Sequence, residues 1–469
     1  MVKVVLKPGR DESLRRFHPW VFSGAVAQVQ GSPAEGDLVG VYSAEGQFLA
    51  SGHWQIGSIA VRILSFDANP TAPDFWTNSI ARALAVREAV GLFPLGTGSA
   101  DMVPNGTNCF RLVHGEGDGL PGLIIDWYDG VCVLQAHSVG MWRAKGQICE
   151  ALQAVFGERL KAVYDKSSGT APFKAGLDLV DGYLWRAPGF EARETVVLEN
   201  GRKFLVNWEE GQKTGFFLDQ RDNRELVGRY AAGRRVLNLF CYTGGFSIYA
   251  LTAGAALVDS VDSSAKAISL VDKNIQLNSG EADAAVPSPD RATLGIVRGG
   301  TASEAQRWGP TKEDVWRGEL PRSEAAAAFS EVQAEATREL PRSEAVELNN
   351  YCEDAIEFLR KTEAGKYDLM IVDPPAFAKH RGALKNALRA YQRLNAAAIA
   401  KVAPGGLVFT FSCSQVVDKI TFANTVFSAA AQTGRSVRIL DRLCQGADHP
   451  VSIYHPEGEY LKGLLLYVE

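Results

Sequence analysis

Strand-like and helix-like segments alternate from residue 235 onward, and this alternation constrains the fold more than any other feature of the sequence. Alternation of this kind is typical of βαβ units, in which helices cover both faces of a parallel sheet. The sequence therefore predicts an α/β fold with a doubly wound sheet. A last strand at 461–468 is expected to close the sheet edge. The other strands are predicted at 235–240, 256–262, 367–373 and 406–413, and the helices at 246–253, 264–278 and 383–402.

Two of these strands end in residues that can carry chemistry. One ends in Asp373, followed by Pro374 and Pro375, and another ends at Cys413. Because ligands of open parallel sheets collect beyond the carboxyl ends of the strands, a thiolate and a carboxylate placed there can face one substrate. A cysteine in this position can act as a nucleophile. Its alternative role is that of a small buried apolar residue, and the surrounding motifs favour the nucleophile.

The strand at 235–240 leads into a glycine turn that opens a helix. Gly244 lies in this turn, and Asp262 follows at the end of the next strand. Glycines let a ligand approach the backbone, and a carboxylate at that strand end can accept hydrogen bonds from ribose hydroxyls. The turn lacks a full Gly-x-Gly-x-x-Gly pattern, so turn and carboxylate together indicate an adenosine-containing cofactor. Asp354 is expected either to meet the adenine amine or only to cap a helix N-terminus, and both interpretations stay open.

The rest of the chain is expected to form two further domains. Residues 1–72 contain short strands separated by turn signals, which is typical of a small β-barrel. Residues 73–195 combine a helix at 75–90 with strands and a second helix, and are expected to form an α+β middle domain. Residues 196–469 complete the chain. The glycine-rich segment 115–119 can be an anion-binding loop or a hairpin connection, and the hairpin is favoured.

The segment 280–345 interrupts the alternation of strands and helices. It contains the same seven residues twice, at 319–325 and at 339–345, and it is rich in Ala, Glu, Ser and Pro. A single repeated pair is too little for a repeat architecture. The composition predicts a flexible insertion, with an inert surface role favoured over partner binding.

Composition excludes several classes of protein. No run of eighteen apolar residues occurs and the N-terminal segment does not resemble a signal peptide, so a soluble, cytoplasmic protein without a membrane partner is expected. The seven cysteines are widely spread and form no cluster with the seven histidines, so neither a disulfide framework nor a metal site is predicted. The net charge of −5 arises in 281–348, which holds 13 acidic and 8 basic residues, and the remainder is balanced. A basic-rich start is compatible with an RNA-facing surface or with an ordinary solvated one.

These motifs, in this order, resemble those of class I S-adenosylmethionine-dependent methyltransferases, which have a Rossmann-like sheet. The run Gln212–Arg221 (QKTGFFLDQR) closely resembles the signature of the bacterial family that methylates cytosine C5 in 23S ribosomal RNA. The start of the chain, with Lys7–Arg10 and His18–Phe22, resembles the RNA-binding PUA domain of that family, and Ala447–Pro450 matches near the end. The resemblance covers nearly the whole chain except 280–345.

The resemblance implies a mechanism in which Cys413 adds to cytosine C6, because C5 alone is too poor a nucleophile to take a methyl group from a sulfonium. The thiol pKa would have to be lowered locally. Asp373 is expected to hold the base, at N3 and N4, and the acceptor of the C5 proton stays open. The remaining expected site residues are Pro374, Pro375 and Phe377 around the base, and Asn238, Phe240, Tyr242, Gly244, Asp262, Asp354, Gln212, Thr214 and Phe217 around the S-adenosylmethionine.

Two residue roles and two other functions remain open at this point. Phe377 can equally be a packing residue, and the Gly-Phe-Phe-Leu of the signature can be a strand that only packs. A related family methylates a guanine nitrogen and shares the signature, but its chemistry needs no cysteine. A third reading is an RNA-binding assembly factor without catalytic turnover. The expected partner is RNA, namely 23S ribosomal RNA, turned out of its stack to reach the site, and a homodimer is left open.

Overall fold

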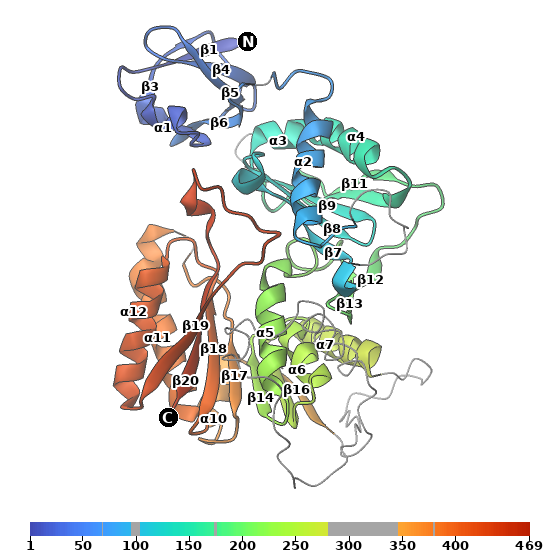
Figure 1. Cartoon of the computed structure of the whole chain (residues 1–469), viewed down its shortest axis with the longest axis vertical. Helices are drawn as coiled ribbons and strands as arrows, with labels where there is room; N and C mark the ends of the chain where they lie inside the picture. Colours follow the sequence, from blue (N-terminus) through green and yellow to red (C-terminus); the bar gives the residue numbers. More distant parts are fainter. Residues whose placement is uncertain (68, 95–103, 173–175, 280–345, 379) are drawn as a thin grey trace, which may run out of the picture.

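The computed structural model describes residues 1–67, 69–94, 104–172, 176–279, 346–378 and 380–469. Figure 1 shows the three larger sheets following one another down the long axis of the molecule, in the order of the sequence. The predicted insertion and its repeated heptapeptide lie outside the described residues. No helix among the described residues is long and apolar enough to cross a lipid bilayer.

The N-terminal sheet has six strands around a core of its own. Val4, Leu6, Val39 and Val41 are fully or almost fully buried in this core. Its first strand, β1 (Val2–Leu6), pairs in parallel with β4 (Leu38–Tyr42) and antiparallel with β3 (Val26–Gln30). A short helix, α1 (Glu12–Arg15), precedes β2. The strands, in spatial order, are β2 (Trp20–Phe22), β6 (Ile59–Ser65), β5 (Phe48–Trp54), β4 (Leu38–Tyr42), β1 (Val2–Leu6) and β3 (Val26–Gln30).

The middle sheet has five strands, covered by helices α2 (Phe75–Ala89), α3 (Val139–Arg143) and α4 (Lys145–Phe156). The glycine-rich segment 115–119 joins β7 to β8, which pair antiparallel, so it is the hairpin connection. Its Glu116 and Asp118 accept hydrogen bonds from arginines. In spatial order the strands are β11 (Gly182–Arg186), β10 (Ala162–Asp165), β9 (Val131–Ala136), β8 (Leu123–Tyr128) and β7 (Cys109–His114).

A separate hairpin, β12 (Glu194–Glu199) and β13 (Arg202–Asn207), follows the middle sheet. Its Val197, Phe204 and Val206 belong to the same buried cluster as the strands of the C-terminal sheet. The expected boundary between residues 195 and 196 falls inside β12, and the division into three domains stays a prediction.

The C-terminal sheet has seven strands, and its first five neighbours run parallel, which confirms the predicted α/β fold. Every residue of β18 is buried, because helices cover both faces of the sheet. The strands, in spatial order, are β16 (Glu347–Cys352), β15 (Leu257–Asp262), β14 (Arg235–Leu239), β17 (Leu369–Val372), β18 (Gly406–Ser412), β20 (Lys462–Val468) and β19 (Val437–Cys444). The helices are α5 (Arg221–Ala231), α6 (Gly245–Thr252), α7 (Ala265–Asn278), α10 (Ala355–Lys361), α11 (Leu384–Lys401) and α12 (Lys419–Thr433).

One expectation about this sheet and one alternative for the signature segment are wrong. The last strand, β20, does not form the edge: it lies antiparallel between β18 and β19, and β19 is the edge strand. The Gly-Phe-Phe-Leu of the signature is not a strand, since residues 211–217 form turns that lead into a short 3-10 helix, Leu218–Gln220.

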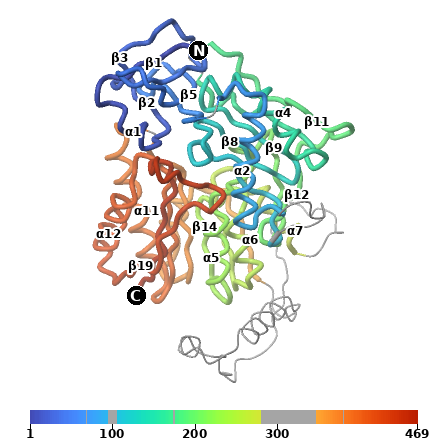
Figure 2. Tube along the Cα trace, turned by 45° about the horizontal axis from the view of Figure 1, so that its top comes forward, coloured from blue at the N-terminus to red at the C-terminus, as the bar shows by residue number. Residues whose placement is uncertain are grey.

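The connection from β19 to β20 rises out of the sheet and reaches the N-terminal sheet, as both Figure 1 and Figure 2 show. We call residues 445–461 the β19–β20 connection. Its buried Asp448 joins the C-terminal part to the middle part: Oδ2 accepts from the Arg221 guanidinium at 2.8 Å and from the backbone N–H of Arg111 at 2.9 Å. The backbone carbonyl of Asp448 accepts from the buried Arg87 at 2.7 Å. Asp448 lies in the Ala447–Pro450 motif.

Candidate active site

A cavity of about 320 Å³ lies at the carboxyl ends of the C-terminal strands. The chain runs outward from β14 to β15 and β16, and then returns to place β17 on the other side of β14. This reversal of strand order is where ligands bind in open α/β sheets. The cavity is lined by Gln212, Lys213, Phe216, Phe217, Asp219, Gln220, Arg224, Phe240, Cys241, Tyr242, Thr243, Gly245, Phe246, Asp262, Ser263, Ser264, Asp354, Ala355, Asp373, Pro374, Pro375, Cys413 and Leu461.

The backbone around the cavity is held in an uncommon conformation. Phe240 and Tyr242, in the turn between β14 and α6, have φ of 59° and 48°, and Lys213 of the signature has φ of 51°. Non-glycine residues with positive φ cost roughly 1–3 kcal/mol each and gather at ligand sites. The two strained segments are tied together, because the hydroxyl of Tyr242 accepts the backbone N–H of Gln212 at 3.0 Å.

Two carboxylates stand at the end of the cavity nearest β15 and β16. Asp262 closes β15, and its Oδ2 accepts the backbone N–H of Tyr242 at 3.0 Å. Asp354 is the N-cap of α10 and accepts from the backbone of Ile356 and Glu357 at 3.0 Å. Asp354 therefore caps the helix and lines the cavity at the same time. Both bonds to Asp354 end on Oδ1, so its Oδ2 is not used by the cap, and each oxygen of Asp262 accepts one backbone N–H and keeps a further lone pair. This end therefore offers acceptors to the hydroxyls and amine of a nucleoside.

The other end of the cavity holds Asp373 and Cys413, which follow the neighbouring strands β17 and β18. Burial, reinforced by the negative charge of Asp219, raises the pKa of Asp373 to about 7. Burial and the charge of Asp373 raise the pKa of the Cys413 thiol to about 11. The direction for Cys413 is opposite to the lowered pKa that the sequence reasoning required. A thiolate therefore forms here only if the proton moves to a nearby base.

Asp219 is a cavity residue to which the sequence reasoning gave no role. Burial opposes its ionisation, but Lys213 and His449 hold its pKa below the ordinary value. Its Oδ2 accepts the hydroxyl of Tyr460 at 2.6 Å, whereas its buried Oδ1 has no hydrogen-bond partner among the described residues. Lys213, Asp219 and Gln220 all belong to the signature quoted above, so the signal was present in the sequence without a role assigned to each position.

The loop that carries Cys413 is fastened on both sides. The ammonium of Lys462 donates to the backbone carbonyls of Ser414 and Val417, each at 2.6 Å. The hydroxyl of Ser414 donates to the carbonyl of Ala378 at 2.6 Å. These bonds connect the end of β18 to β20 and to the segment after Asp373. The thiol is therefore held at the cavity wall by its backbone.

Four of the expected site residues do not line the cavity. Asn238 is buried in β14 and donates to Ser247 at 2.9 Å, and Gly244 forms the left-handed N-cap of α6. The ring of Phe377 packs against Tyr391 with centroids 4.7 Å apart. Thr214 is fully buried, and its hydroxyl donates to Asp126 of the middle sheet at 2.6 Å. The structure thus gives Thr214 a contact between sheets.

Known proteins resemble the chain along its whole length. A family model for a PUA-like domain matches residues 4–66, and a model for an S-adenosylmethionine-dependent methyltransferase matches residues 179–285. A curated protein of Shewanella amazonensis, named ribosomal RNA large subunit methyltransferase I, is 35% identical over 475 residues, covering 100% of this chain and 99% of its own. The protein of the same name from Aeromonas hydrophila is 34% identical, covering 99% and 98%.

Two solved structures share the whole fold. A methyltransferase crystallised with S-adenosylhomocysteine has a TM-score of 0.71 at 19% identity, and a methyltransferase from Streptococcus mutans has a TM-score of 0.70 at 18% identity. Each comparison covers 100% of both chains. At this level of identity the likeness shows the fold, including the PUA-like start and the Rossmann-like sheet.

Proposed function

The chain belongs to the ribosomal RNA large subunit methyltransferase I family, and we propose that it methylates C5 of a cytosine in 23S ribosomal RNA through a covalent bond between Cys413 and cytosine C6. The observation that carries the proposal is that Cys413 and Asp373 line the same cavity as Asp262, the carboxylate that we expect to accept from the ribose hydroxyls of the cofactor. Methylation of a guanine nitrogen would need no sulfur nucleophile there. The cavity also holds enough carboxylates to exchange the protons that this reaction moves.

The cofactor of this reaction is S-adenosylmethionine, which supplies a methyl group on a positively charged sulfur. The cavity residues fit it. Asp262 and Asp354 offer acceptors for the ribose hydroxyls and the adenine amine, and the rings of Phe217 and Tyr242, with centroids 5.1 Å apart, provide apolar surface. Pro374 and Pro375 lie next to Asp373 along the wall that would receive the cytosine.

We assign the proton transfers to the two buried carboxylates. Asp373 takes the proton of the Cys413 thiol and delivers it to cytosine N3 while the sulfur–C6 bond forms, so that C5 becomes electron-rich. A group whose pKa lies near 7 is well suited to give and take protons at neutral pH. After C5 has gained its methyl group, Asp219 accepts the C5 proton through its free oxygen. The sulfur–C6 bond then breaks, N3 returns its proton to Asp373, and Cys413 leaves as thiolate.

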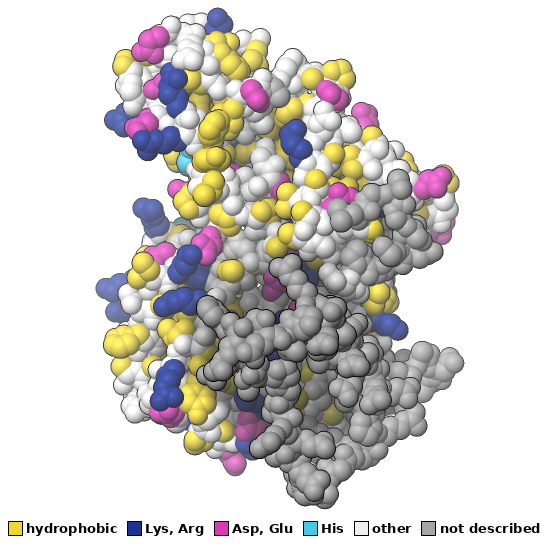
Figure 3. Space-filling model, in the orientation of Figure 1, with side chains coloured by type: hydrophobic (Ala, Val, Ile, Leu, Met, Phe, Trp, Pro, Cys, Tyr) yellow, Lys and Arg dark blue, Asp and Glu magenta, His cyan; other side chains and the backbone are white. Residues whose placement is uncertain are grey.

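The RNA would be gripped by the PUA-like sheet. Lys and Arg side chains stand along the left margin of the N-terminal sheet and again beside the C-terminal sheet, with an indentation between them (Figure 3). Lys3, Lys7 and Arg10 are exposed, whereas Arg15 and Arg16 are paired with acidic neighbours one helical turn away. Positive charge on both sides of the indentation fits a phosphate backbone, which supplies most of the affinity for nucleic acid.

The test uses RNA in which cytidine is replaced by 5-fluorocytidine. Fluorine at C5 cannot leave as a cation, so the proposed mechanism stops after methyl transfer and leaves the protein bonded to the RNA. The full-length protein with S-adenosylmethionine should form an adduct that survives denaturing electrophoresis, and Cys413→Ala should form none. Cys444→Ala, which changes an exposed cysteine outside the cavity, is the matched control.

Mapping of methylated nucleosides in 23S RNA from cells with and without the protein identifies the base. Loss of one 5-methylcytidine is the expected result. Loss of a methylguanosine, together with full activity of Cys413→Ala, would contradict the proposal. Absence of S-adenosylmethionine binding in a calorimetric titration would leave only the assembly-factor alternative.

A further inference from the structure

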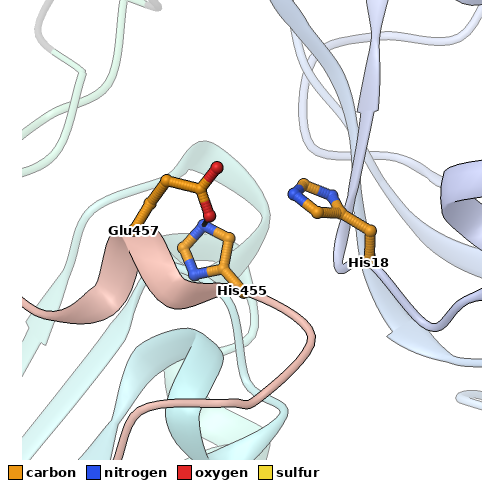
Figure 4. Close-up of side chains that lie close together, drawn as sticks. All are labelled: His18, His455 and Glu457. Carbon is orange, nitrogen blue, oxygen red and sulfur yellow. Dashed lines mark ion pairs between the residues drawn. The ribbon is translucent and has the colours of Figure 1, made fainter.

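Two histidines and a glutamate meet where the β19–β20 connection touches the N-terminal sheet. His18 precedes β2, and His455 and Glu457 come from the β19–β20 connection. One potential ligand atom from each residue lies within 4.8 Å of the other two. Figure 4 shows the imidazole of His18 pointing across the junction toward the other two side chains. We refer to these three residues as the junction cluster.

His455 is buried and its ring nitrogens are not paired within the described part of the chain. Its side chain is 3% exposed. Neither ring nitrogen has a hydrogen-bond partner among the described residues, and the nearest carboxylate oxygen, on Glu457, is 3.9 Å from Nε2. Burial of a polar group without a partner costs about 1–3 kcal/mol.

The second histidine is oriented by its own strand. Nδ1 of His18 accepts the backbone N–H of Trp20 at 3.2 Å and also lies 3.3 Å from the backbone carbonyl oxygen of Trp20. To bind a metal through Nε2, the ring has to give up the first contact and carry its proton on Nδ1, where the carbonyl accepts it. Histidines that bind metals usually donate their second nitrogen to a carbonyl or carboxylate in this way. Glu457 is exposed and can move to complete the set.

We propose that the junction cluster binds one divalent transition-metal ion of the borderline class, for which Zn²⁺ is the reference. Two imidazoles and one carboxylate are a common ligand set for zinc with a fourth position open to water. Ligand atoms around tetrahedral zinc lie about 3.4 Å apart, given bond lengths of roughly 2.0–2.1 Å. The three side chains therefore have to close by up to about 1.4 Å, part of which the exposed Glu457 can supply.

The site would connect parts of the molecule that the sequence keeps at opposite ends. Trp20 packs against His455 with ring centroids 4.3 Å apart. The indole N–H of Trp20 donates to Glu116 of the middle sheet at 2.8 Å, and Arg62 pairs with the same carboxylate at 2.8 Å. An ion at this point would fix the PUA-like sheet against the β19–β20 connection. This inference does not depend on which base the protein methylates.

The test is a calorimetric titration of the full-length, chelator-treated protein with Zn²⁺. One ion should bind per chain, and Glu457→Gln and His455→Ala should each weaken binding by at least about 10-fold, since even loss of an outer partner costs about 10–100-fold. Glu459→Gln is the matched control, because Glu459 lies in the same connection but pairs with Lys419. This variant should bind Zn²⁺ as the unaltered protein does.

A second measurement separates the junction cluster from the free cysteines. Co²⁺ bound by imidazole and carboxylate lacks the intense near-ultraviolet absorption of cobalt–thiolate bonds. The expected spectrum has visible bands without that absorption, and Glu457→Gln, an exposed substitution that should not disturb folding, should weaken the bands. Absence of saturable binding, binding that survives both substitutions, or a thiolate spectrum would overturn the proposal.

Discussion

The side-chain amide of Gln220 donates a hydrogen bond to Oδ2 of Asp373 over 3.0 Å. This bond fixes one carboxylate oxygen at the end of β17 and partly opposes the effect of burial and of Asp219 on the pKa of Asp373. The balance of these effects places the pKa of Asp373 at about 7. The charge of Asp373 in turn raises the pKa of the Cys413 thiol. The charge of Asp373 and the ionisation of the Cys413 thiol are therefore coupled.

Asp373→Asn should separate these two effects. The amide carries no charge, so the pKa of Cys413 should fall and alkylation of its thiol by iodoacetamide at neutral pH should become faster. Methyl transfer should nevertheless fall by about 10²–10⁴-fold, because the proton donor to N3 is lost. Asp368→Asn, at the opposite end of β17 and outside the cavity lining, is the control for both measurements. Slower alkylation in Asp373→Asn would contradict the coupling.

Asp219→Asn should let the reaction start but not finish. Without an acceptor for the C5 proton, the methylated adduct cannot release Cys413, so a protein–RNA species should accumulate on ordinary cytidine RNA. Denaturing electrophoresis with labelled RNA measures it directly. Asp222→Asn, on the adjacent helix and outside the cavity lining, should release its product normally. If Asp219→Asn turns over without an adduct, another base removes the proton.

The titration of Asp373 should also affect stability. Its pKa rises from 3.8 in the reference state to about 7 in the folded protein, so the folded state holds the proton more tightly. The group therefore contributes stability at acidic pH that is lost as the pH rises through about 7. The free energy of unfolding in urea, measured against Asp373→Asn between about pH 5 and pH 8, should show this loss. If the free energy of unfolding of the unaltered protein minus that of Asp373→Asn instead rises with pH, the prediction is wrong.

Thr214→Val should cost stability but not cofactor affinity. The substitution removes the hydroxyl that donates to the buried Asp126, which should lower the free energy of unfolding by about 1–3 kcal/mol. The dissociation constant for S-adenosylmethionine should change by less than about twofold, whereas Asp262→Ala should raise it well beyond that. A large loss of cofactor affinity in Thr214→Val would instead support the role expected from the signature.

The parallel part of the C-terminal sheet was predictable because strands buried on both faces are almost wholly apolar, as β17 and β18 are. The edge was not. Most residues of β19 are exposed or half-buried, so its pattern gives no strong periodic signal. The position of β20 between β18 and β19 results from pairing in the folded sheet. An apolar run in the sequence does not indicate which strands will lie beside it.

The cavity shows the same division between local and long-range information. The sequence predicts that Asp373 and Cys413 lie close together, because the carboxyl ends of parallel strands meet at the same edge of a sheet. Asp219 could not be placed in this way, because its position depends on irregular turns in the signature segment. The junction cluster was equally hidden, since His18 and His455 lie at opposite ends of the chain and meet only through the β19–β20 connection.

That connection has a mechanical consequence. Leu461 forms part of the cavity wall, and His455, a few residues earlier, packs on Trp20 of the PUA-like sheet. A force that bound RNA exerts on the PUA-like sheet would thus reach the cavity wall through the few residues between His455 and Leu461.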